Sequence, residues 1–151
     1  MAWSLLPFTH NARLYARVKH DDNWYPWSEF SLQSDVAETY SCNLKSNGHP
    51  ITYADGSFEV GKLTLPKGRY LILFKAILRD AAIYLFIGSK TVHSSAVRCW
   101  NKEEQTGTGF YVRTLTEETV ITFKVSLHSE SSSPISLADD ARYNMAYAIH
   151  L

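Results

Sequence analysis

Residues that could carry out catalysis are few and scattered in this sequence. The six histidines, at positions 10, 20, 49, 93, 128 and 150, fall singly, and none belongs to an HExxH or His-x-His arrangement of the kind that binds zinc. There is no Gly-x-Ser-x-Gly segment, and neither cysteine lies in a sequence typical of a catalytic thiol. The sequence therefore predicts a protein that is not an enzyme and that uses no cofactor.

Acidic pairs are the remaining candidates for binding an ion. They are Asp21-Asp22, Glu103-Glu104 and Asp139-Asp140. Carboxylates of this kind can bind calcium together with backbone carbonyls, but they are also common at loop tips without a metal. We expect no metal site, and calcium at these pairs stays an open alternative. Cys42 and Cys99 lie far apart in the sequence, which predicts free thiols and leaves their pairing open.

The charge balance excludes several classes of partner. Fifteen basic and fifteen acidic residues leave no net charge, so we expect no binding to nucleic acid and no attraction to an anionic membrane. No apolar run approaches the ~20 residues that would cross a bilayer, so we expect no membrane insertion. The first residues do not have the pattern of a secretory signal, which predicts synthesis in the cytoplasm without a signal peptide.

The aromatic cluster in DDNWYPWSEF, residues 21–30, is the strongest candidate for a binding surface. Trp24, Tyr25 and Trp27 surround Pro26 in a segment that otherwise resembles a loop. Such aromatics are either a plug packed under a barrel or an exposed anchor for a partner, and both interpretations stay open. The second makes Trp24, Tyr25 and Trp27 a predicted partner-binding patch, because the polar residues beside them would form its rim.

The elements around these residues have the period of strands. In VITFKVSL, residues 120–127, every second residue is apolar, which is typical of a half-buried strand. The last strand, YNMAYAIHL, alternates in the same way, and we expect Met145, Tyr147, Ile149 and Leu151 on its buried face. About eight to ten short strands separated by turn clusters predict one all-β domain over residues 1–151, an antiparallel sandwich. Residues 31–40 are a weak helical candidate.

Two strands are apolar on both faces. In RYLILFKAIL, residues 69–78, alternate residues form two apolar sets, and AAIYLFIG, residues 81–88, does the same. A sandwich core can bury only one of these faces. We expect a neighbouring subunit, rather than the chain's own N-terminal third, to cover the other face. Leu71, Leu73, Tyr84 and Phe86 are therefore a predicted interface of a homo-oligomer.

The order of motifs resembles a known superfamily. DGSF, LPKGRYLILF, AAIYLFIGSKTV, TGTGFYVRTL, VITFKVSL and the closing AYAIHL are together similar to the jelly-roll superfamily of tumour necrosis factor and the complement globular heads. The resemblance covers roughly residues 55–151 and implies a jelly roll that forms trimers. Ala146 stands where many members carry glycine, and TEE at Thr116 replaces their Gly-Asp turn. We expect no stalk or anchor in front of the domain, and single jelly rolls also build viral capsids.

The sequence thus favours a non-enzymatic structural protein, a jelly-roll subunit of a symmetric homo-oligomer. The expected role is a virion vertex, spike head or capsid-surface component that contacts copies of itself, as a trimer or pentamer, and neighbouring structural proteins. The alternative is a soluble trimeric recognition module that binds a receptor or glycan. A third hypothesis, a carbohydrate-binding or enzymatic jelly roll, depends on the Trp24–Trp27 aromatics alone.

Overall fold

The computed structural model describes residues 2–5, 13–20, 23–24, 26–31 and 38–151. The chain divides into two compact units: Met1–Glu38 with His150–Leu151, and Thr39–Ile149. Compact units of contacts need not fold independently. The single domain expected over residues 1–151 therefore stays a prediction.

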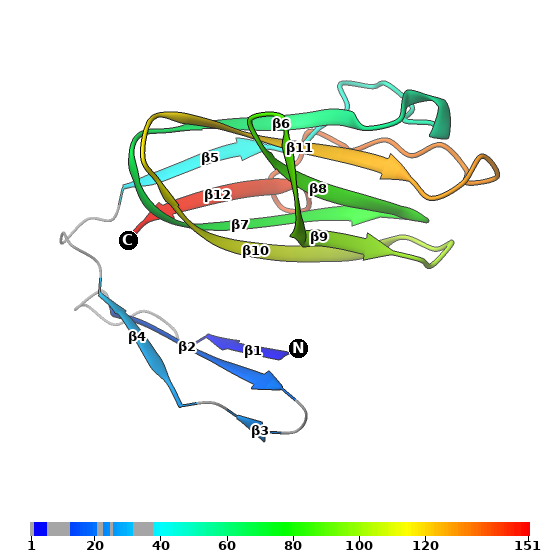
Figure 1. Ribbon diagram of the computed structural model, residues 1–151. Helices are drawn as coiled ribbons and strands as arrows, with labels where there is room; N and C mark the ends of the chain where they lie inside the picture. Colours follow the sequence, from blue (N-terminus) through cyan, green and yellow to red (C-terminus); the bar gives the residue numbers. More distant parts are fainter. Residues whose placement is uncertain (1, 6–12, 21–22, 25, 32–37) are drawn as a thin grey trace. The chain divides into compact units, whose positions relative to one another are not determined.

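The N-terminal unit contains a small antiparallel sheet (Figure 1). Its strands are β1 (Ala2–Leu5), β2 (Arg13–His20), β3 (Asn23–Trp24) and β4 (Ser28–Ser31). Strand β2 is central and pairs with each of the other three.

The second unit is a sandwich of two four-stranded antiparallel sheets, with strand orders β10-β7-β12-β5 and β6-β11-β8-β9 (Figure 1). Its elements are β5 (Thr39–Asn43), the 3-10 helix η1 (Tyr53–Asp55), β6 (Phe58–Leu65), β7 (Gly68–Leu78), β8 (Ala81–Ile87), β9 (Lys90–Cys99), β10 (Gln105–Leu115), β11 (Thr119–Leu127) and β12 (Met145–His150). Eight strands in two facing sheets form a jelly roll. The predicted all-β antiparallel jelly-roll sandwich is confirmed. Strand β5 begins at Thr39, inside the segment considered as a helix.

The core lies between the two sheets and follows the period of two in the sequence. In β7, Tyr70, Ile72 and Phe74 are at most 2% exposed, and they face Ile121 and Phe123 of β11, which are fully buried. Phe74 packs against Phe123 with ring centroids 5.4 Å apart. The inner faces predicted for both strands are confirmed.

Strand β12 corrects one prediction. The residues of β12 that face the core are Ala146 and Ala148, both at 0% exposure, whereas Tyr147 is 40% exposed. The expectation that Met145, Tyr147 and Ile149 are buried in the core is therefore wrong. Large aromatic side chains of neighbouring strands pack beside these alanines. Tyr40 of β5 is paired with Ala148, and its ring lies edge-on to that of Tyr70, with centroids 6.0 Å apart.

Asn144 fixes the start of β12 beside β7. Its Oδ1 accepts a hydrogen bond from the backbone N–H of Ile77 at 2.9 Å, and its Nδ2 donates to the carbonyl of Ala138 at 3.0 Å. Its own carbonyl accepts from Leu44 N–H. The side chain is buried, so these bonds satisfy groups that would otherwise destabilise the fold.

Gly109 allows the two sheets to approach closely at β10. A Cβ at this position would lie 2.4 Å from Cζ of Phe74 and 2.7 Å from a methyl group of Val97. Only glycine fits without a shift of these side chains. Strand β10 can therefore stay in register with β7 over its whole length.

Candidate self-association face

The outer face of β7 and β10 is apolar at its centre. Leu71 pairs with Val112 and Leu73 with Phe110, and all four side chains are half-buried. They point away from the core, because the alternate residues of β7 fill it. Leu71 and Leu73 are thus partly open to solvent, on the face where the sequence predicts an interface.

Strand β12 extends this apolar surface across the sheet. Since Ala146 and Ala148 face inward, Met145, Tyr147 and Ile149 face outward beside β7. We define the apolar outer face as the outward apolar side chains of three adjacent strands: Leu71, Leu73, Ile77, Phe110, Val112, Met145, Tyr147 and Ile149. The sequence placed Leu71, Leu73 and Ile77 on this face and missed the other five residues, although GFYVRTL alternates visibly.

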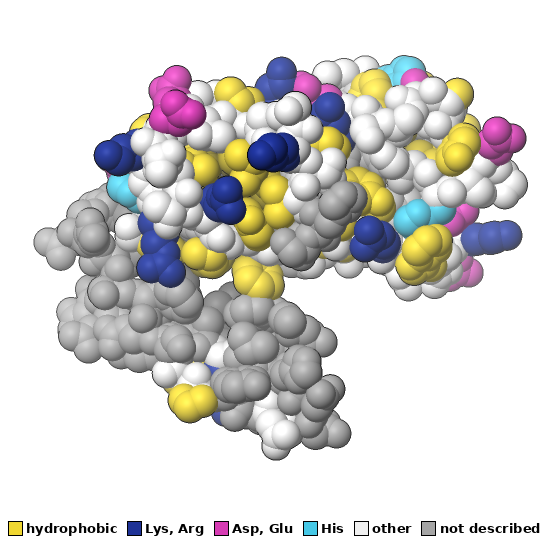
Figure 2. Space-filling view, in the orientation of Figure 1, with side chains coloured by type: hydrophobic (Ala, Val, Ile, Leu, Met, Phe, Trp, Pro, Cys, Tyr) yellow, Lys and Arg dark blue, Asp and Glu magenta, His cyan; other side chains and the backbone are white. Residues whose placement is uncertain are grey.

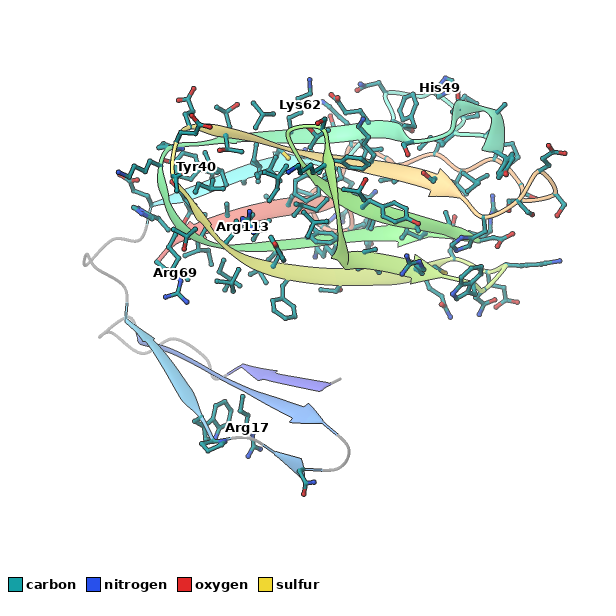
Figure 3. All side chains as sticks on the ribbon, viewed as in Figure 1. Arg17, Tyr40, His49, Lys62, Arg69 and Arg113 are labelled. Atoms are coloured by element: carbon teal, nitrogen blue, oxygen red, sulfur yellow. The ribbon has the colours of Figure 1, made fainter. Side chains whose placement is uncertain are left out.

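Polar residues border and interrupt the apolar outer face. Lys75 lies between Leu73 and Ile77 on the same side of β7, paired with Thr108, and Arg69 pairs with Thr114 at one end of the strand. Figure 3 shows Arg69 at that end of the sheet. An apolar centre with a charged and hydroxylated rim is the usual anatomy of a protein interface.

Tyr84 and Phe86 lie in the opposite sheet, in β8. A cation of the same unit covers each ring: Arg98 lies 5.7 Å from the centroid of Tyr84, and Lys124 lies 4.7 Å from that of Phe86. The structure therefore does not bring the four predicted interface residues together. One flat contact cannot cover both pairs, and their role in an interface stays a prediction.

The predicted aromatic patch is described only in part. Trp27 is 39% exposed, and the guanidinium of Arg17 lies 4.6 Å from its ring centroid. Tyr25 and the side chain of Trp24 lie outside the described residues. Partner binding by this patch stays a prediction.

The carboxylates of Asp139 and Asp140 already have partners. Asp139 accepts hydrogen bonds from Asn43 at 2.6 Å and from Lys45 at 3.2 Å. Arg142 donates from Nε to Oδ1 and from a terminal nitrogen to Oδ2 of Asp140, and it lowers the pKa of that carboxyl to about 2. Among the residues that the structure describes, no three His, Cys, Asp or Glu side chains are grouped to hold a metal ion.

The two cysteines are free thiols, as expected. Burial raises the pKa of Cys42 to about 11, so its thiol is protonated at neutral pH and a poor nucleophile. The cavity beside it, about 450 Å³, lies between β5 and β6 and is lined by both Lys45 and Glu59. Over the described part of the chain, no helix is long and apolar enough to cross a membrane.

Comparison with known proteins gives one structural likeness. No protein-family model matches the sequence, and no curated protein matches it. Thirty chains of solved structures match. One is the globular domain of the zebrafish complement 1qA protein, to which the chain is similar with 15% identity and a TM-score of 0.49, over 76% of this chain and 95% of that one. The fold assignment rests on the strand order above, and such an identity transfers no function.

Proposed function

We propose that the chain is a non-enzymatic structural subunit that assembles into a symmetric homo-oligomer through the apolar outer face. The observation that carries the proposal is the orientation of β12. Ala146 and Ala148 face the core, while Met145, Tyr147 and Ile149 face outward. These outward side chains lie on the same face of the sheet as Leu71 and Leu73 of β7. The outer face of an antiparallel sheet is normally polar when it meets water.

The size of the face suits an interface. The strands β10, β7, β12 and β5 have 11, 11, 6 and 5 residues, so at about 3.4 Å per residue and about 4.8 Å between strands the sheet covers about 540 Å². A stable interface covers about 800 Å² on each partner. The sheet face therefore supplies about two thirds of the area that a specific contact needs, and its rim supplies the rest.

The partner is a second copy of the chain. A face on which several large apolar side chains gather favours aggregation of a free subunit unless it is covered. Closed symmetric assembly is the usual way in which identical subunits cover such a face. The proposed state is a trimer or pentamer, in which different parts of the face on neighbouring copies contact each other.

Within this proposal, the subunit serves as a virion vertex, spike head or capsid-surface component beside other structural proteins. Support comes from the charge distribution. Acidic and basic side chains are mixed over the visible surface of the jelly-roll unit, without a field of one sign (Figure 2), and the whole chain has no net charge. Such a surface suits an exposed position better than one that lines a genome.

The mass of the native particle tests the proposal. Native mass spectrometry and sedimentation of the full chain are measured over a wide range of concentrations. We expect a trimer or pentamer that persists in high salt, because an apolar contact is not screened. A chain that stays monomeric at every concentration would refute self-assembly.

A further inference from the structure

Three connections meet at one end of the jelly-roll unit (Figure 1). They are the β7–β8 turn, the β9–β10 loop and the start of the β11–β12 loop. Asp80 of the turn joins them: its N–H donates to the carbonyl of Asn101 at 2.8 Å, and its carbonyl accepts from His128 N–H at 3.1 Å. Its carboxylate accepts from Ser132 Oγ at 2.7 Å. The three segments therefore form one connected surface.

Trp100 lies flat on this surface. Its indole stacks on the ring of His128, with centroids 3.8 Å apart and planes 13° apart, yet Trp100 is still 69% exposed. His128 Nε2 donates to the carbonyl of Cys99 at 3.0 Å. Since the side chain of Cys99 is buried at the end of β9, the stack is anchored to the sandwich. One face of the indole is covered by His128, and the other is open.

Two other exposed aromatic side chains differ from Trp100 because a cation lies over each ring. Arg142 covers Tyr143 at 5.3 Å from the ring centroid, and Arg17 covers Trp27. Among the described residues, no cation lies over Trp100. Its ring is held in place before any ligand arrives, so binding there costs little ordering of the side chain.

The surroundings indicate the chemical class of the ligand. The residue after Trp100 is Asn101, and the residue after His128 is Ser129, whose hydroxyl lies 2.9 Å from that of Ser131. Amide and hydroxyl groups therefore follow both stacked rings in the sequence, together with the charged Lys102 and Glu130, and the Asn101 amide oxygen accepts from Glu103 N–H at 3.1 Å. These groups can donate and accept hydrogen bonds to the hydroxyls of a neutral polyol.

A folded protein fits this place poorly. One indole offers at most about 250 Å² of apolar contact, well below the ~800 Å² per partner of a stable interface. The loop beyond it continues with Lys102, Glu103 and Glu104, and charged residues are depleted at interface centres. A small ring that covers the open face of the indole fits better.

We propose that this end of the jelly-roll unit is a binding site for a neutral sugar ring. The C–H groups of a pyranose carry partial positive charge and stack on the electron-rich face of Trp100. Asn101 and the serines beside His128 hydrogen-bond its hydroxyls. The site consists of loop residues and includes none of the apolar outer face. Sugar binding can therefore be tested independently of self-assembly.

The test begins with the full chain on an array of neutral oligosaccharides, followed by titration of the best binder with tryptophan fluorescence. We expect saturable binding that Trp100→Ala weakens about tenfold or more. Tyr143→Ala, which removes another exposed aromatic side chain, leaves it unchanged. Trp100→Phe keeps a flat ring and retains most of the binding, which separates loss of the platform from a folding defect.

His128→Gln tests the positioning role of the histidine. Glutamine can still donate to the carbonyl of Cys99 but offers no ring, so we expect a smaller loss of affinity and a more mobile indole by fluorescence anisotropy. Raising the salt concentration leaves the affinity of a neutral sugar unchanged. The proposal is overturned by the absence of binding to any neutral oligosaccharide, by full binding in Trp100→Ala, or by salt-sensitive binding of an arginine-rich peptide alone.

Discussion

Replacing Leu73 by aspartate places a charge near the centre of the apolar outer face. In a free subunit the new carboxylate meets water, and the main loss is the cross-strand contact with Phe110, about 0.2–1 kcal/mol. At this chain length such a loss lowers the melting temperature by about 2–4 °C at most. In an oligomer the unpaired carboxylate is buried and weakens association by about 3 kcal/mol or more, which is about a hundredfold in the dissociation constant.

Sedimentation and thermal unfolding of Leu73→Asp are measured together, with Phe86→Asp as the matched control. Phe86 lies on the opposite sheet beside Lys124, which can pair with the new carboxylate. We expect Leu73→Asp to give a folded, smaller particle and Phe86→Asp to leave the assembly intact. If Leu73→Asp assembles normally, this face is open to solvent and the reasoning fails. If it yields no folded subunit, the face is packed within the chain.

Three further predictions concern single residues. Gly109→Ala should lower the free energy of unfolding by about 1–3 kcal/mol in denaturant titrations, because the new Cβ overlaps Phe74; equal stability would show that the core can relax. Asp140 should titrate near pH 2 by NMR, and Arg142→Ala should raise this pKa toward 3.8, the ordinary value. The stabilising effect of the pair is thus present above about pH 4 and is lost as the pH falls toward 2. Cys42 should react slowly with a thiol reagent at pH 8 and faster toward pH 11; fast reaction at pH 8 would contradict its burial.

The sequence predicted the sandwich because strong alternation is read directly from single strands. The inner face of β11, with Phe123 at its centre, is one example. It did not predict which face of β12 is buried, because large residues were assumed to face inward. In the folded unit, Tyr40 and Tyr70 supply the bulk near this strand, and only small residues such as Ala148 fit against them.

Only two of the four predicted interface residues, Leu71 and Leu73, lie on the apolar outer face, and the reason is topological. Strands β7 and β8 are separated only by Arg79 and Asp80, which suggests a hairpin within one sheet. Asp80 instead carries the chain from one sheet to the other, so Leu73 and Phe86 end on opposite sides of the sandwich. The stacking of Trp100 on His128 could not be predicted, because it depends on tertiary contacts between two loops.

Covalent footprinting of the full chain tests the central claim most directly. Side chains are labelled at concentrations above and below the association midpoint, and the labelled positions are identified by mass spectrometry. We expect Leu71, Leu73 and Tyr147 to be protected in the assembled state, while Tyr84 and Phe86 are labelled equally in both states. Equal labelling of Leu73 and Tyr147 at all concentrations would contradict the claim that copies of this chain associate through the β10-β7-β12-β5 sheet.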